Sequence, residues 1–187
     1  MPTAQIHPHP RSALPSKGRA FTTIEILIVV VIMAIMAAVA VPMIGNRSDI
    51  KIAAAVRKAV ADLQYAQNLS IATRQNVYLR FDTNTYTVCK KVGSVLTAIS
   101  DPIDRMTYTV TLGTNPTSAA LAGVGLAKPS FAGNSVIGFD SVGAPFSFNE
   151  TSGVRTSMTV SAQLQFTCGT TTQTILIEPY TGEISVP

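Results

Sequence analysis

The chain has 187 residues, enough for one domain with its own hydrophobic core besides short terminal segments. Its formal net charge is +4, but the first 20 residues hold three of its cations and no acid, so the rest carries about +1. Such a small excess gives no electrostatic reason to expect nucleic-acid binding. The only histidines are His7 and His9, so the rest of the chain lacks the commonest general base and metal ligand. No nucleotide-binding or nucleophile motif is present either. We therefore predict no enzyme activity, no metal and no cofactor.

Residues 1–20 are predicted to be a disordered basic leader, because they are polar and contain four prolines. Residues 21–46 follow as an apolar segment with a single charge, Glu25. A span of about 20 apolar residues crosses a bilayer, and the stretch from residue 21 to 44 is long enough. An ionised carboxylate in a bilayer costs at least a few kcal/mol without a partner, so Glu25 suggests a function.

This arrangement resembles the class III signal of type IV pilins and type II secretion pseudopilins. The shared features are a basic leader, a small residue, Phe21, Glu25 as the fifth residue from Phe21, and an apolar run. The resemblance implies cleavage between Ala20 and Phe21 by a prepilin peptidase, and N-methylation of Phe21. Glycine is usual before the cut, and Ala20 departs from that pattern. Pro42 lies where such helices commonly carry a kinking proline.

The resemblance also implies how such a chain assembles. The new amine of Phe21 would pair with Glu25 of its own chain or of a neighbouring subunit, which removes the cost of an isolated carboxylate. The implied partners are the prepilin peptidase, other pilins or pseudopilins, the inner-membrane assembly platform and membrane lipid, with secreted proteins as further candidates. The implied location is the bacterial inner membrane, single-pass, with the N-terminus cytoplasmic and the β-domain periplasmic, and then a pseudopilus or pilus.

Three other interpretations of the apolar segment remain open. It could be an ordinary signal peptide, cut after Ala38-Val39-Ala40. It could be a membrane anchor without an assembly role, or a buried helix of a soluble protein. The last fits least, because the run is apolar on every face.

Residues 47–76 are predicted to form the second half of one long helix. Apolar or small residues recur at a spacing of three to four, which indicates one buried face. That face holds Ile52, Val56, Ala59, Leu63, Ala66 and Ser70. The opposite, polar face holds Lys51, Arg57, Lys58, Asp62, Gln67 and Arg74. Gly45 to Ser48 is a weak point between the two halves.

Residues 77–187 are predicted to form an antiparallel β-domain. Residues 77–81 and 85–89 alternate around a turn and read as a hairpin. Further strands are expected at residues 106–112, 135–140, 157–168, 173–178 and 183–186, with a loop over 113–134. The predicted fold class is therefore α+β, a long N-terminal helix packed on an antiparallel sheet or sandwich, as the pilin resemblance also implies.

Two short elements narrow the resemblance to the H-type minor pseudopilin and FimT minor pilin family. Residues 137–143 resemble its internal F-D-x-x-G element, and residues 177–184 its closing T-G-x-I turn. The implied function is that of a minor subunit of a type II secretion pseudopilus or a type IV pilus. The alternative is a membrane-tethered binding module for DNA, an exoprotein or a surface.

Some members bind DNA through basic residues after the last glycine turn, where this chain has Glu183, so we expect no DNA binding by that route. Lys90, Lys91, Lys128 and Arg155 are other cations that the fold could bring together.

Cys89 and Cys168 are the only cysteines. Export would allow a disulfide between them, and two buried free thiols are the alternative. Asp101 and Asp104 could form a weak cation site or be ordinary solvated carboxylates.

Overall fold

The computed structural model describes residues 21–43, 47–127 and 129–187, and it divides into two compact units, Met1–Gly45 and Asn46–Pro187. In the first unit, helix α1 runs from Thr23 to Met43. The sequence predicted one helix continuing to about residue 75. The structure has a second helix, α2 (Arg47–Thr73). Of the predicted weak point, residues 45 and 46 lie outside the described residues, and Arg47 and Ser48 begin α2.

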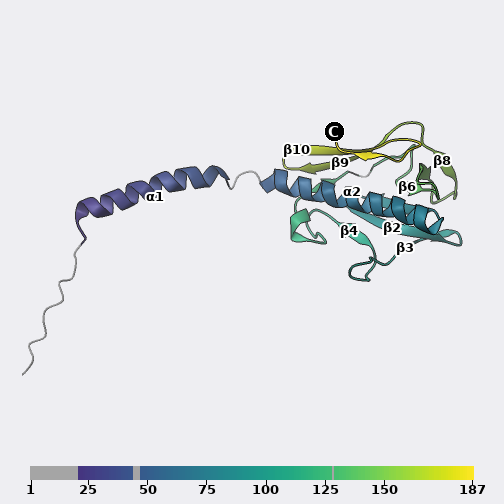
Figure 1. The fold of residues 1–187 in the computed structure, drawn as a ribbon, viewed down its shortest axis with the longest axis horizontal. Coiled ribbons are helices and arrows are strands. Elements are labelled where there is room, and N and C mark those ends of the chain that lie inside the picture. Colours follow the sequence, from purple (N-terminus) through teal and green to yellow (C-terminus); the bar gives the residue numbers. More distant parts are fainter. Residues whose placement is uncertain (1–20, 44–46, 128) are drawn as a thin grey trace, which may run out of the picture. The chain divides into compact units, whose positions relative to one another are not determined.

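The second unit consists of α2 and short strands in two sheets (Figure 1). The strands and one 3-10 turn are β1 (Val77–Asp82), β2 (Thr85–Val92), β3 (Val95–Ala98), β4 (Thr109–Thr111), η1 (Ala119–Leu121), β5 (Gly125–Leu126), β6 (Val136–Phe139), β7 (Pro145–Phe148), β8 (Arg155–Ser157), β9 (Ala162–Cys168), β10 (Thr171–Ile177) and β11 (Ile184–Ser185).

All strand pairs are antiparallel. The larger sheet has the order β3-β2-β1-β6-β7-β8, with β4 also paired to β2, and the smaller has the order β11-β10-β9-β5. In Figure 1, β9 and β10 lie on one side of α2, and β2, β3 and β4 lie on the other. The predicted α+β class, with a helix packed on antiparallel sheet, is confirmed.

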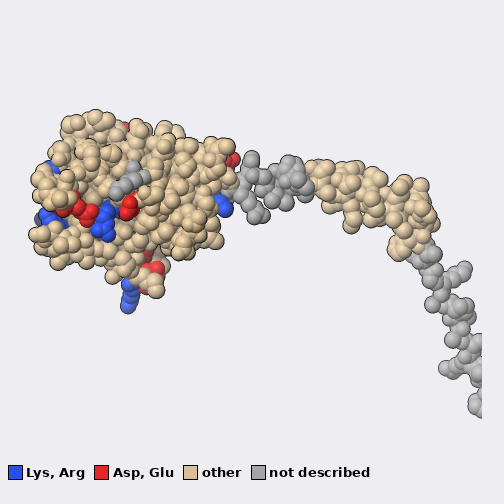
Figure 2. Space-filling model, turned by 180° about the vertical axis from the view of Figure 1, so that it is seen from behind, with Lys and Arg blue, Asp and Glu red and all other residues tan. Residues whose placement is uncertain are grey.

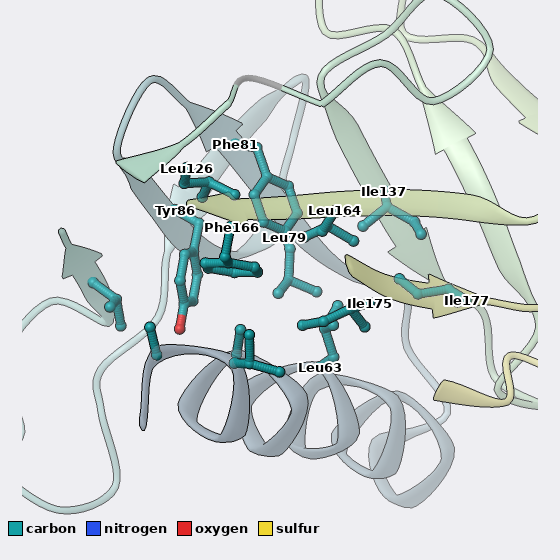
Figure 3. Close-up of a cluster of buried hydrophobic side chains, with 14 of the residues drawn as sticks. Leu63, Leu79, Phe81, Tyr86, Leu126, Ile137, Leu164, Phe166, Ile175 and Ile177 are labelled. Carbon is teal, nitrogen blue, oxygen red and sulfur yellow. The ribbon is translucent and has the colours of Figure 1, made fainter. Parts of the chain in front are cut away.

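The main hydrophobic core lies between α2 and the inner faces of both sheets (Figure 3). Every residue predicted for the buried face of this helix is at most 4% exposed. Leu63 packs there with strand residues of both sheets, including Leu79, Ile137, Leu164 and Ile175. The 3.6-residue period of α2 therefore determines which face the sheets cover.

The sequence prediction was wrong for Asp62 and for four strands. Asp62 was placed on the polar face but is only 2% exposed. Strands β3, β7 and β8 were not predicted, and the expected loop over 113–134 contains η1 and β5. The predicted hairpin at 77–89 is confirmed, with Tyr78 opposite Cys89 and Phe81 opposite Tyr86.

A second, smaller cluster lies apart from the main core and includes Tyr78, Cys89 and Phe146. Cys168 belongs to the main core. Both cysteines are buried and free. The possible disulfide is therefore not formed, and the structure has the alternative of two free thiols, because the two side chains lie in different clusters.

Candidate assembly interface

The first turn of α1 contains the one acidic residue of this helix. The backbone N–H of Glu25 donates to the carbonyl of Thr22 at 3.0 Å and to its hydroxyl Oγ1 at 3.3 Å. Thr22 thus caps the helix, and the Thr-x-x-Glu spacing is that of a capping box. A carboxylate in the first turn also interacts favourably with the helix dipole. Among the described residues, the Glu25 carboxylate has no hydrogen-bond or ion-pair partner, so it remains free for a cation.

Between Ile24 and Met36, α1 exposes apolar side chains on all sides. Their exposed fractions run from 48% for Val29 to 66% for Met36, and Phe21 is 76% exposed just before the helix. The large ones in the helix are Ile24, Ile26, Leu27, Ile28, Val29, Val30, Val31, Ile32, Met33, Ile35 and Met36. Exposed apolar surface on this scale marks an interaction site.

Within the described residues, no helix is both long and apolar enough to cross a membrane. The predicted cleavage bond joins Ala20 to Phe21. Phe21 is described, but Ala20 lies outside the described residues. Pro42 is within α1, but its side chain is not described, and the kink there stays a prediction.

Asp62 forms a buried polar cluster that the sequence did not predict. Its carboxylate accepts hydrogen bonds from the Tyr86 hydroxyl at 2.5 Å and the Tyr108 hydroxyl at 2.9 Å, and it pairs with Lys58 Nζ at 2.6 Å. Burial, together with the adjacent carboxylate, raises the pKa of both tyrosines well above the usual value. The cluster joins α2 to β2 and to the segment before β4, so it stabilises the packing of these elements.

The two turns that carry the family resemblance meet at Gln67. Its Nε2 donates to the carbonyl of Gly143 at 3.0 Å and to that of Gly182 at 3.2 Å. Gly182 has φ +69°, and a Cβ there would lie 2.5 Å from both the Gln67 amide and the Gly143 carbonyl. Glycine is therefore required for the close approach as well as for the backbone angle. These motif residues hold the fold together and do not form a ligand site.

A basic groove of about 510 Å³ lies beside the end of α2. It is lined by Arg74, Lys90 and Lys91 without any acidic residue. Among the described residues, none of these three cations has an ion pair. Of the other cations considered from the sequence, Arg155 instead pairs with an aspartate at 3.8 Å, and Lys128 is not described. Figure 2 shows one face of the molecule, with basic and acidic side chains interspersed in one zone and a few others toward the edges.

Asp101 and Asp104 each accept a hydrogen bond within their own loop. Each uses its Oδ1 to accept a backbone N–H two residues on, from Ile103 and Met106, both at 2.8 Å. In the described part of the chain, no group of three or more potential metal ligands occurs.

No protein-family model matches the chain, and no characterised protein matches it by sequence. Among solved structures, it is similar to the type IV minor pilin FimU of Pseudomonas aeruginosa (strain PAO1), with 12% identity and a TM-score of 0.47. The match covers 73% of this chain and 87% of that one. At that identity and score, the likeness decides neither the family nor the function.

Proposed function

We propose that the chain is a pilin-like subunit, a minor pseudopilin or minor pilin, that assembles into a filament through α1. The observation that carries the proposal is a helix with apolar side chains exposed all round and one carboxylate, Glu25, without a partner among the described residues. A surface of this kind is covered when copies of such a helix pack together. The proposal includes both type II secretion and type IV pili, because they share the N-terminal signal.

In this proposal, the segment from residue 21 to 46 is held in the inner membrane before assembly, and a prepilin peptidase cuts between Ala20 and Phe21. The new amine at Phe21 then lies one helical turn from Glu25. Pairing with the amine of the same or the next subunit removes the cost of an isolated carboxylate among apolar helices. Only helix registers that bring amine and carboxylate together are favoured, so the charge selects a packing arrangement.

Processing is tested on the full chain, extracted from membranes with and without a co-expressed prepilin peptidase. Intact mass and N-terminal sequencing should show a peptidase-dependent start at Phe21, heavier by one methyl group. A start at Val41 would indicate an ordinary secreted domain, and an uncut chain would indicate an anchored module. Either result would exclude the assembly mechanism.

The charge and the capping role of Glu25 are separated by two variants. Glu25→Gln keeps a side chain that fits a capping box but removes the charge, while Thr22→Val removes the capping hydroxyl and keeps the charge. We expect Glu25→Gln to enter sheared filaments poorly at normal membrane levels, and Thr22→Val to enter them almost normally. The opposite order would mean that Glu25 acts only on the helix end.

The basic groove favours a second candidate, a tethered module that binds an anionic ligand. Unpaired cations at Arg74, Lys90 and Lys91 would contact phosphates or carboxylates. The test compares binding of the full chain to a DNA duplex and to an acidic peptide over a range of salt concentrations. Lys90→Ala and Lys91→Ala should weaken binding, whereas Lys51→Ala on α2, which is not in the groove lining, should not. Equal loss in all three variants would mean non-specific attraction.

A further inference from the structure

The loop between β3 and β4 presents two large apolar side chains to solvent. Ile103 is 90% exposed and Met106 is 70% exposed. The loop is held in shape by Asp101 and Asp104, whose carboxylates accept the N–H groups of these two residues. In addition, the N–H of Asp101 donates to the carbonyl of Met106 at 2.8 Å, and that of Arg105 to the carbonyl of Asp101 at 3.0 Å. We name residues 101–106 the knob, an ordered loop with an exposed apolar tip.

The knob also contains one cation, Arg105. Arg105 has φ +62°, a left-handed conformation that costs a non-glycine residue roughly 1–2 kcal/mol. Such strain persists where the surrounding structure imposes it and is common at functional loops. Among the described residues, Arg105 has no ion-pair partner. The knob therefore offers two apolar side chains and an unpaired guanidinium.

A pocket of matching character lies between β8 and the start of β9. Its volume is about 410 Å³, and no charged side chain lines it. The buried side chains of Phe131 and Met158 contribute apolar surface to it, and Val160, 75% exposed, adds to its lining. The remaining lining residues are Ser130, Ala132, Thr156, Ser157, Thr159, Ser161 and Ala162. We name this the neutral pocket.

A carboxylate lies next to the neutral pocket. Ser161, a lining residue, has its hydroxyl Oγ within 3.0 and 3.1 Å of the two carboxylate oxygens of Glu178. Among the described residues, Glu178 pairs with no cation. The surroundings of the pocket thus supply an apolar interior and a neighbouring negative charge, the complement of the apolar tip and positive charge of the knob.

The knob and the neutral pocket belong to opposite sides of the second unit. In Figure 1, the connection between β3 and β4 lies on one side of α2, whereas β8 and β9 lie on the other. We propose that the knob of one copy of this chain occupies the neutral pocket of the next copy, with Arg105 beside Glu178. Such a contact joins two different surfaces, so it can repeat from copy to copy, and it extends along a filament where its rotation does not close a ring. It adds to the α1 contacts and rests on the proposed function for its place in the filament.

The contact is tested by cysteine crosslinking of the full chain purified in detergent, in the absence of prepilin peptidase. The native Cys89 and Cys168 are buried and can stay. A chain with both Ile103→Cys and Val160→Cys should give, under mild oxidation, a ladder of dimers, trimers and larger species on a non-reducing gel. Ile103→Cys alone should stop at dimers. The control is Ile103→Cys with Val142→Cys, since Val142 is 78% exposed and outside the pocket lining.

A charge reversal tests the proposed pairing in the same double-cysteine chain. Arg105→Glu should reduce the ladder at least tenfold, and adding Glu178→Arg should restore it. A missing ladder, an equal ladder with the Val142 control, or no restoration by the second reversal would overturn the proposal. The crosslinking experiment needs no processing by the peptidase. A negative crosslinking result would therefore not change the results of the peptidase and Glu25 experiments, and negative results there would not exclude the contact between knob and neutral pocket.

Discussion

Removing the Asp62 carboxylate should destabilise the second unit more than any change at its surface. In Asp62→Ala, the hydroxyls of Tyr86 and Tyr108 lose their acceptor in a buried place. Each unsatisfied buried hydroxyl costs about 1–3 kcal/mol, so the two together cost about 2–6 kcal/mol. Lys58 adds little to this, because its side chain is 40% exposed and returns to water. We expect a loss of about 2–6 kcal/mol, a large part of the total stability of a domain.

The assay is urea unfolding of the full chain in detergent, followed by tyrosine fluorescence, since the chain has no tryptophan. The midpoint should fall while the slope with urea stays constant. Asp62→Asn, which keeps one acceptor oxygen, should lose about 1–3 kcal/mol. The matched control is Asp49→Asn on the same helix, where an exposed carboxylate accepts from Thr171 at 2.8 Å; there we expect a change within about 0.5 kcal/mol. If Asp62→Ala loses less than about 1 kcal/mol at an unchanged slope, the buried carboxylate is not the acceptor that stabilises this cluster.

Three further predictions concern the same unit. Gly182→Ala should lower the free energy of unfolding in urea by over about 2 kcal/mol, since its Cβ would lie 2.5 Å from a backbone oxygen. The control Gly123→Ala has a similar φ but lies in open space, and it should cost about 1 kcal/mol. Equal losses would mean that the backbone angle alone matters. Burial raises the pKa of Tyr86 and Tyr108 in the folded state, so their contribution to stability should be fully present below about pH 10. Above that pH it should fall by up to about 1.4 kcal/mol per pH unit for each tyrosine, which urea midpoints at a series of alkaline pH values would check. Burial likewise raises the pKa of Cys89 to about 11, and its side chain is 0% exposed, so at pH 8 a maleimide should modify it at least about a hundredfold more slowly in the folded chain than in urea.

Helix α2 shows which buried residues the sequence pattern can predict and which it cannot. Its apolar period identified most of the buried face, because a helix turns by a fixed angle per residue and the sheets cover one side, but it missed Ala55, which is 1% exposed. The period could not place Asp62, since a charged residue beside a buried stripe is normally solvated. Its burial depends on Tyr86 and Tyr108, which come from β2 and the segment just before β4. Only the tertiary fold brings these hydroxyls to the carboxylate.

The missed strands have a related cause. β7 begins with Pro145 and has only four residues, so its Phe-Ser-Phe alternation is too short to indicate a strand. β8 is an exposed three-residue edge strand, defined by its pairing with β7 and not by its composition. Similarly, the free state of Cys89 and Cys168 follows from their places in two different clusters, which spacing along the chain does not specify.

The residues that carry the family resemblance fall into two physical groups. Gly143 and Gly182 are already satisfied within the chain, because Gln67 bridges them and no side chain fits between them. A resemblance at such positions concerns the fold and predicts no ligand. Phe21 and Glu25 are the opposite case. Among the described residues, nothing covers the Phe21 side chain and no cation pairs with the Glu25 carboxylate. Groups whose apolar surface and charge are left unsatisfied by their own chain are those that another molecule must satisfy. The function of this chain is therefore to be sought first in what packs against α1, and Glu25→Gln beside Thr22→Val is the pair of variants that addresses it directly.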